Sequence, residues 1–541
     1  MAITTVTATN SVFPSFRPAL VAVSVAAVFC FPTALSADSS FSPAVELTTH
    51  GYQLKLPPSM ETDKGAALEV VPSLAWRYQG PRMQSRVDVN HQRVWYKDSQ
   101  RSPYSLNEYT AQNSLSGFDR RLVWTLNASQ NHQIRGGGEG AGLFRDRITT
   151  VDSLSRTNRY GTNVLLSNAP HKEAQFALDL SANKFESNRP AEDDSFGNID
   201  NEQFRANFST SKVHQHGGVF WRGGGSLART NREERARLVR DNAQLQLGIP
   251  LLPGLAWMVK GAYEQNSIQN SDFTNEFSSA GTGLEWQFGR VSRINLTYNK
   301  VLSDNDQSNF VAADFLLAPS RRTSLSGSWD KRYFGRTAQV AGSYRLRFLT
   351  MRLSYSDNLT TRSFLETELL DLGIFVCPDG SSDIGDCTTF PGPGYQLGVN
   401  EQLLQFFDTD LNIRDDVILN RQGAFALGYS RNRLTTSLQL SSSELRYVEQ
   451  SRVDRRHNAS LLTSWQLTSI SRLQANVRAY QYNFGVNQRE DKSWQYELGW
   501  TRNLSSVSDI NITAKRSRRD SNLDEFDYRE NRLSLSYNYR F

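Results

Sequence analysis

The sequence predicts an all-β protein: a transmembrane, antiparallel, up-and-down β-barrel of about 24 strands (about 22–26), without a plug domain. Three observations lead to this prediction. The chain repeats hairpins in which apolar and polar residues alternate, its last ten residues alternate without a break, and no apolar run after residue 36 has the length of a membrane helix. Because lipid accepts only helices and closed barrels as spanning structures, alternation in a membrane protein predicts a barrel.

The C-terminal segment 532–541 shows the alternation most clearly. Leu533, Leu535, Tyr537, Tyr539 and Phe541 fall on one face, and arginine, serine and asparagine fall on the other. A terminal strand that ends on an aromatic residue resembles the closing strand of bacterial outer-membrane barrels, where this end is also the assembly signal. The resemblance implies that role for Tyr537, Tyr539 and Phe541.

The N-terminus has the layout of a secretory signal peptide. Arg17 is the only charge before the apolar run 19–31, and the small residues Ala34 and Ser36 follow. We expect a signal peptide over residues 1–36, with cleavage after Ser36, or alternatively after Ala37. The run is too short to span a bilayer comfortably. A signal peptide and an aromatic closing strand together predict the outer membrane of a Gram-negative bacterium.

Tight turns between the alternating segments set the strand number. About eleven occur, near residues 80, 119, 170, 216, 252, 291, 320, 349, 432, 470 and 505, and periplasmic turns of bacterial barrels are short. Residues 66–541 are therefore predicted to form the barrel. Residues 37–65 are predicted to be an N-terminal periplasmic segment with a possible first strand at 51–56. That leaves no segment of plug size, which counts against a plugged siderophore-type receptor.

One long connection, residues 358–416, interrupts the pattern and is predicted to be extracellular. It contains Cys377 and Cys387, the two cysteines that remain after signal removal, and we expect them to form a disulfide. Short helices are expected at 365–372 and 401–407. The connection is expected to fold into or over the lumen as a constriction; the alternative is a disordered surface loop.

Charged residues inside the strands are predicted to face the lumen. A lysine or arginine on the lipid face at the bilayer midplane costs about 2–4 kcal/mol, so the apolar alternation partners must face lipid. The residues predicted to line the pore are Arg205, Lys260, Glu285, Arg345, Arg347 and Arg352. The last three lie around one tight turn, where they would form a positive patch that favours anions. The alternative is that Arg347 only extends to the membrane interface and that acids on distant strands, such as Glu285 and Asp330, cancel the field.

The composition narrows the remaining classes. The chain is 38% hydrophobic, with a mean hydropathy of −0.52, so a membrane protein of this polarity must enclose its polar half. A net charge of +5 without a basic block gives no indication of nucleic acid binding. We predict no catalytic residues, metal or cofactor, because the histidines are scattered and Asp408–Asn412 lacks the glycine and glutamate of a calcium loop. The alternative fold is a soluble β-sandwich, but the sequence predicts more hairpins than one sandwich contains.

The stretch 416–438 and the proline-bearing strand 70–74 resemble the outer-membrane proteins associated with PEP-CTERM/exosortase exopolysaccharide systems. The resemblance implies a channel-like barrel near polysaccharide export, and no catalytic residues. The expected function is a porin-like barrel that passes or helps to export hydrophilic material, including exopolysaccharide. The alternatives are a non-conducting adhesin or receptor that acts through its loops, and an outer-membrane enzyme. Expected partners are outer-membrane lipid, the barrel-assembly machinery and export components.

Overall fold

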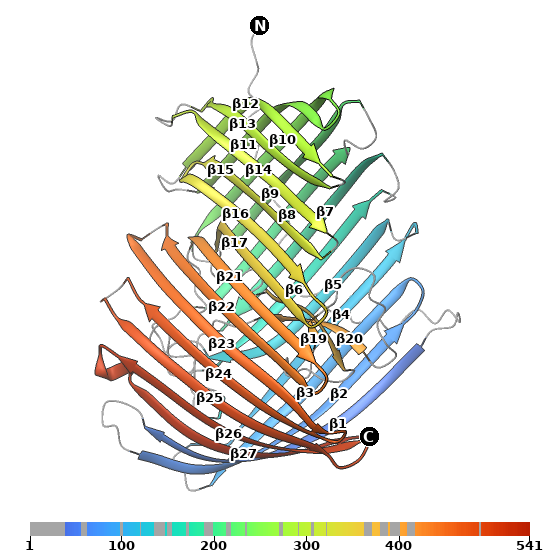
Figure 1. The fold of residues 1–541 in the computed structure, drawn as a ribbon. Coiled ribbons are helices and arrows are strands. Elements are labelled where there is room, and N and C mark those ends of the chain that lie inside the picture. The colour runs from blue at the N-terminus through green and yellow to red at the C-terminus, as the bar shows by residue number, and fades with distance from the viewer. Residues whose placement is uncertain are drawn as a thin grey trace.

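A computed structural model of the chain shows one closed antiparallel sheet of 24 strands (Figure 1). It describes residues 38–541 apart from 56–61, 98–100, 120, 135–146, 149–153, 169–172, 189–197, 213–217, 233–234, 270–273, 290, 304–307, 321, 362–370, 379–387, 390–400, 408–416, 449 and 486–487. Within the described residues, the other elements are a small three-stranded sheet and one 3-10 turn, η5 (Asp524–Phe526).

The barrel strands follow one another in chain order. The first twelve are β1 (Asp38–Lys55), β2 (Thr62–Gln79), β3 (Met83–Lys97), β4 (Tyr104–Gly117), β5 (Leu122–Ile134), β6 (Leu154–Ser167), β7 (Ala174–Ser187), β8 (Ile199–Lys212), β9 (Phe220–Arg232), β10 (Arg235–Leu252), β11 (Leu255–Ile268) and β12 (Thr274–Phe288). The others are β13 (Ser292–Val301), β14 (Phe310–Ser320), β15 (Thr323–Arg332), β16 (Gly335–Arg345), β17 (Leu349–Thr361), β21 (Val417–Arg431), β22 (Leu434–Tyr447), β23 (Arg452–Thr468), β24 (Ser471–Asn483), β25 (Glu490–Asn503), β26 (Ser508–Ser521) and β27 (Tyr528–Arg540).

The sheet closes where the first strand meets the last. β1 pairs with both β2 and β27, and the β1–β27 register runs from Ala44 opposite Arg540 to Lys55 opposite Arg529. The backbone N–H of Phe541 donates to the carbonyl oxygen of Pro43 at 3.0 Å, one step beyond that register. We call this junction of β27, β1 and β2 the seam. A closed sheet leaves no edge strand, as a barrel in lipid requires.

The two ends of the barrel differ in the length of their connections. All eleven predicted tight turns join consecutive strands at one end, which we call the short-turn end. The opposite end, the loop end, carries the connection between β17 and β21. That connection contains the small sheet of β18 (Asp371–Pro378), β19 (Thr388–Thr389) and β20 (Glu401–Phe407). The turn count from sequence therefore gave the strand number correctly.

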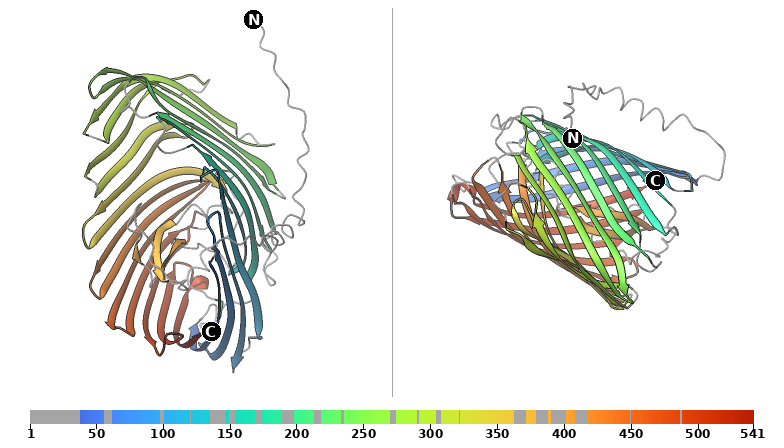
Figure 2. Two further views of the ribbon diagram at one scale, coloured as in Figure 1. Left: turned by 90° about the vertical axis from the view of Figure 1, so that its right-hand side faces the viewer. Right: turned by 90° about the horizontal axis from the view of Figure 1, so that it is seen from above.

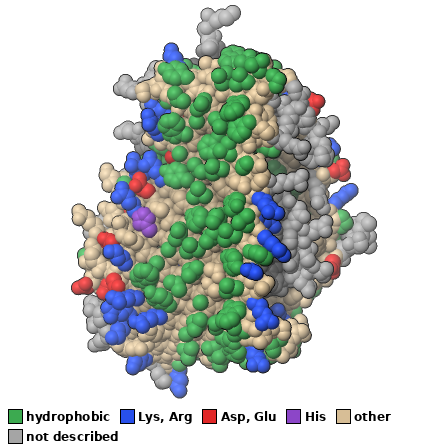
Figure 3. Space-filling view, in the orientation of Figure 1, with side chains coloured by type: hydrophobic (Ala, Val, Ile, Leu, Met, Phe, Trp, Pro, Cys, Tyr) green, Lys and Arg blue, Asp and Glu red, His purple; other side chains and the backbone are tan. Residues whose placement is uncertain are grey.

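Alternation along each strand separates a lipid face from an inner face. On β27, Leu533 and Leu535 are 59% and 48% exposed, whereas Glu530 and Arg532 are 1% and 8% exposed. The exposed apolar side chains form a continuous band across the wall (Figure 3). A band of lipid-facing apolar residues on a closed antiparallel barrel is the form of outer-membrane barrels. The protein is therefore an integral protein of a Gram-negative outer membrane.

Some predicted boundaries change in the structure. β1 occupies residues 38–55 and β2 begins at residue 62, within the range 37–65 that was predicted to hold a periplasmic segment and a possible first strand. Residues 401–407 are the strand β20 and not a helix. The predicted signal peptide lies outside the described residues, as does the predicted disulfide between Cys377 and Cys387, whose side chains are not described. Among the described residues, no helix is long and apolar enough to cross a membrane.

Candidate functional site: a divided lumen

Ion pairs cross the lumen between strands that are not neighbours in the sheet. Lys260 Nζ of β11 lies 2.5 Å from Asp330 Oδ2 of β15, although β12, β13 and β14 separate the two strands. Glu264, two inward-facing positions beyond Lys260 on β11, accepts two hydrogen bonds from Arg332 of β15, at 2.5 and 2.9 Å. Side chains can bridge these strands only where the wall curves sharply, so the lumen is narrow here.

The same region continues towards the short-turn end. Arg222 of β9 forms an ion pair with Glu285 of β12, and Gln246 of β10 donates to Asp314 of β14 at 3.3 Å. Many inner-face side chains of β11 to β14 are almost fully buried. These are Lys260 (6% exposed), Glu264 (6%), Asn266 (2%), Glu285 (2%), Asn295 (1%), Thr297 (3%), Asn299 (1%) and Ala312 (2%). We call the part of the lumen enclosed by β9–β16 the closed lobe, because its own side chains fill it.

An apolar cluster separates the closed lobe from the rest of the lumen at the loop end. Leu238 of β10 and Ile268 of β11 pack against Leu359 of β17 and against Val417 and Leu419 of β21, all at most 5% exposed. This contact joins strands that lie far apart in the sheet order. It forms a partition across the barrel.

The partition arises because β17 leaves β16. The two strands pair only from Val340–Tyr355 to Arg345–Thr350. By alternation, Leu359 should face lipid, as Leu353 does on the same strand. It is instead buried against Leu238. The loop-end halves of β17 and β21 therefore turn into the barrel. Figure 2 (left) shows the green and yellow strands arching above the orange and red ones.

The remaining lumen, bounded by β21–β27 and β1–β8, is the main chamber. Its inner faces are polar and vary in exposure: inner side chains nearer the loop end, such as Asp454, Asp491 and Glu530, are at most 2% exposed, whereas others nearer the short-turn end stay partly accessible. Examples on three consecutive strands are Ser437, Gln439 and Ser441 of β22, Asn458 and Ser460 of β23, and Gln474, Asn476 and Arg478 of β24. Small polar side chains that stay partly accessible indicate a wall that faces water.

The small sheet β18–β20 lies inside the ring of barrel strands in the view along the barrel (Figure 2, left). β18 pairs with both β19 and β20, and none of the three pairs with a barrel strand. The predicted constriction loop therefore contains a folded element within the outline of the main chamber.

A polar network lines the main chamber at the seam. His50 of β1 bonds Ser534 of β27 through Nδ1 at 2.8 Å and Glu69 of β2 through Nε2 at 2.9 Å. Gln92 of β3 donates to the same Glu69 carboxylate at 2.7 Å. The network thus connects four adjacent strands from inside and adds side-chain bonds to the closure of the sheet.

The predicted pore-lining residues occupy three different settings. Arg205 lies on the inner face of β8, since its neighbours Phe204 and Phe208 are 50% and 48% exposed. Lys260 and Glu285 lie in the closed lobe and are held in ion pairs. The ion-pair partners Arg222, Asp330 and Arg332 were not predicted, because alternation gives the face of a residue and not its partner across the lumen.

The three arginines around the turn at 346–348 also differ from one another. Arg345 and Arg352 lie on inner faces of β16 and β17 and are exposed at the short-turn end of the lumen. Arg347 lies in the turn itself, with its guanidinium carbon 4.9 Å from the centroid of the Phe348 ring. Arg347 therefore belongs to the rim of the barrel and to neither strand.

The predicted assembly-signal residues lie on the lipid face at the end of the last strand. Tyr537, Tyr539 and Phe541 are 37%, 36% and 72% exposed, and the rings of Tyr539 and Phe541 meet edge to face at 4.9 Å. Within the described part of the chain, no three or more His, Cys, Asp or Glu side chains are grouped to hold a metal ion. The site is thus a lumen, with polar and charged walls.

Comparison with known proteins gives only distant structural similarity. No family model matches the chain, and no curated protein matches it, so the resemblance to the exosortase-associated family is not confirmed. Among solved structures, the FrpB iron transporter of Neisseria meningitidis (F3-3 variant) is 10% identical with a TM-score of 0.44, over 93% of this chain and 82% of that chain. The siderophore receptor PirA of Acinetobacter baumannii is 8% identical with a TM-score of 0.43, over 93% and 80%. This similarity is too low to indicate what the chain binds.

Proposed function

We propose that the protein is an outer-membrane channel that passes hydrophilic material through the main chamber. The observation that carries the proposal is the contrast between the two parts of the lumen. Inner side chains of the closed lobe, such as Asn295 and Asn299, are 1% exposed, whereas the inner side chains between Ser437 and Ser441 of β22, and their counterparts on β23 and β24, stay partly accessible. A wide barrel whose wall is polar and wet on one side provides an aqueous path.

The long connection between β17 and β21 acts as the constriction in this proposal. Its sheet β18–β20 lies within the outline of the main chamber (Figure 2, left), so it limits the width of the path. A second candidate function follows from the same observation. If the sheet blocks the chamber completely, the protein is a non-conducting surface barrel that acts through its loops as an adhesin or receptor.

Conductance in planar bilayers tests the proposal and separates the two functions. We compare the folded barrel with a variant in which residues 363–415 are replaced by a short glycine–serine linker. A channel with a constriction conducts before the deletion and conducts more after it. A blocked barrel is silent before the deletion and conducts only afterwards. Absence of conductance in both proteins would contradict the channel proposal.

Exopolysaccharide is the proposed transported material. Exopolysaccharide is supported only by the sequence resemblance and by the hydroxyl and amide lining of the chamber, which suits a polyhydroxylated chain. Acidic and neutral polysaccharide fragments added on the short-turn side should reduce the current in a concentration-dependent way. The proposal assigns no catalytic step to the protein, and its partners are membrane lipid, the assembly machinery and export components.

A further inference from the structure

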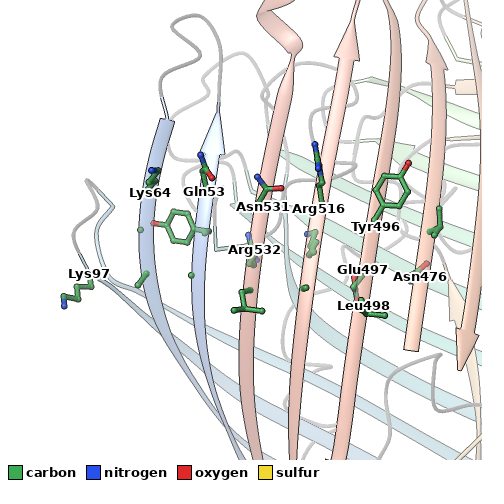
Figure 4. A pocket seen from close by; sticks show the side chains of 18 residues that line it. Gln53, Lys64, Lys97, Asn476, Tyr496, Glu497, Leu498, Arg516, Asn531 and Arg532 are labelled. Carbon is green, nitrogen blue, oxygen red and sulfur yellow. The ribbon is translucent and has the colours of Figure 1, made fainter. Parts of the chain in front are cut away.

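A groove of about 840 Å³ lies on the outer wall at the seam (Figure 4). It crosses β25, β26, β27, β1 and β2 on their lipid-facing side. The small outward residues Gly51, Ala66 and Ala514 form its floor, beside Leu498 and Leu533, which are 51% and 59% exposed. A side chain at Gly51 would meet no atom within 4 Å of its Cβ, so the floor is hollow at that position.

Cationic side chains border the groove on the side of the loop end. Lys64, Lys97 and Arg516 belong to its lining. A second hollow of about 230 Å³ adjoins it and shares three lining residues with it, namely Gln53, Arg516 and Asn531; Lys55, Arg518 and Arg529 complete its basic lining. In Figure 3, lysine and arginine side chains gather at the lower left, beside the apolar band.

Among the residues that the structure describes, most of these cations have no acidic partner. Arg518 pairs with Asp520 through Nε at 2.7 Å. Within the part of the chain that the structure describes, Lys55, Lys64, Arg516 and Arg529 form no ion pair. Four positive charges on adjacent strands repel one another, so binding of an anionic ligand would stabilise the cluster.

The position of the cluster along the membrane normal indicates a lipid headgroup as the anion. On β27, Arg529 and Asn531 lie directly beyond the lipid-facing series Leu533 to Phe541, and on β26 Arg516 follows Ile512 and Ala514. Tyr496 of β25, 48% exposed, lies at the same level, where interfacial aromatic residues are expected. In bacterial barrels the loop end is extracellular, so this level is the headgroup region of the outer leaflet.

We propose that the seam groove binds one phosphorylated, acylated lipid of the outer leaflet, of the lipid A class. A phosphate group sits among Lys55, Arg516 and Arg529, which offer the charge-assisted bonds that guanidinium and ammonium groups form with phosphate. An acyl chain lies along the floor over Gly51, between Leu533 and Ala66, where the absence of a side chain leaves room. The lipid would brace the wall where the first and last strands meet.

Native mass spectrometry of the full-length barrel with added bis-phosphorylated lipid A tests the site. We expect Arg516→Gln/Arg529→Gln to weaken binding about tenfold or more, because the variant loses two guanidinium groups that form charge-assisted hydrogen bonds with phosphate. Gly51→Phe fills the floor and should weaken binding without removing charge. Lipid A without phosphate groups should bind the unaltered barrel weakly. Its affinity should be no higher than that of the double variant for phosphorylated lipid A.

Arg502→Gln is the matched control. Arg502 faces outwards on β25 near the short-turn end, so its removal subtracts a charge from the wall outside the groove. Equal weakening by Arg502→Gln would overturn the proposal in favour of non-specific attraction. Unchanged binding of the double variant and of Gly51→Phe would also overturn it. Each variant is first shown to give the heat-modifiable folded barrel, and conductance is not used as a readout.

Discussion

Lys260 of β11 and Asp330 of β15 are ion-pair partners at 2.5 Å across the inside of the barrel, with three strands between them in the sheet. Their side chains are 7% and 27% exposed, so the pair lies largely out of water. Their distance in the sheet shows that the closed lobe is held by contacts through the lumen as well as by strand pairing.

Removal of one partner of this pair should destabilise the barrel. Lys260→Met leaves the Asp330 carboxylate without its cation, and loss of one member of a buried pair costs about 3–5 kcal/mol. We expect a loss in the free energy of unfolding near the lower end of this range, because the side chain of Asp330 is 27% exposed. Urea unfolding followed by tryptophan fluorescence measures it. The double variant Lys260→Met/Asp330→Leu should recover most of the loss; a double variant as unstable as the single one would contradict this reading.

Close packing of β12 against β13 gives a second prediction. A Cβ at Gly283 would collide with the carbonyl oxygen of Leu296 on β13. Gly283→Val should therefore lower stability by about 1–3 kcal/mol or more, as overpacked sites do, with a matching fall in folded yield. Gly261→Val is the control, because a Cβ at Gly261 of β11 meets nothing within 4 Å. Equal yields for the two variants would show that β12 and β13 can move apart at little cost.

The arginines at the short-turn end should influence ion selectivity. Arg345 and Arg352 are exposed on the inner faces of β16 and β17, where a fixed positive charge raises the local anion concentration. Arg345→Glu/Arg352→Glu should lower the anion-to-cation permeability ratio, read from the reversal potential in a salt gradient. The effect should be largest near 0.01 M salt, where the screening length is about 30 Å.

The control for selectivity is Arg336→Glu. Arg336 lies near the loop end with its guanidinium carbon 5.4 Å from the centroid of the Trp329 ring, and Trp329 is 43% exposed on the lipid side. A charge reversal there should leave the permeability ratio unchanged. If the double variant also leaves it unchanged at low salt, Arg345 and Arg352 do not set selectivity.

The C-terminal aromatic residue should matter for insertion into the outer membrane. Phe541→Ala keeps the backbone bond to Pro43 and removes only the ring, which contacts Tyr539 edge to face. We expect less heat-modifiable barrel in outer-membrane fractions. Phe41→Ala is the matched control, because Phe41 is an equally prominent aromatic side chain, 66% exposed, near the same rim but on β1. Normal insertion of Phe541→Ala would contradict the assembly-signal prediction.

Cys377 and Cys387 are expected to form a disulfide in protein made in an oxidising envelope. The bond would close a small loop and stabilise it by about 2–3 kcal/mol, with no effect on barrel folding. Peptide mapping by mass spectrometry under non-reducing conditions detects the linkage. Two free thiols, or loss of the folded barrel in Cys377→Ser/Cys387→Ser, would show that the prediction is wrong.

Local patterns in the sequence determine most of the barrel, and contacts through space determine the lumen. Alternation in segments such as Leu533–Phe541 specifies which face meets lipid, and tight turns specify the strand number, because both depend on neighbouring residues. The first strand was harder to predict, since β1 begins at Asp38 among residues with little alternation.

The partition of the lumen could not be predicted. Leu359 continues the lipid face of β17 by period, yet it is buried against Leu238 and Ile268 because β17 leaves β16 after Tyr355. The sequence of β17 alone does not indicate where its pairing with β16 ends. In the same way, alternation placed Lys260 inside the barrel, but its partner Asp330 lies 70 residues away and is brought near only by the curvature of the wall.

The seam has a consequence for how the barrel is made. Thr48 and Ser536 are 488 residues apart in sequence, and the hydroxyl of Thr48 donates to that of Ser536 at 2.8 Å. Contacts of such high contact order form late, after every intervening hairpin. Until β27 arrives, β1 presents a long unpaired edge that can join another chain. An incomplete barrel is thus an aggregation hazard, and a helper that shields the free edge of β1 during synthesis and insertion would decide the yield.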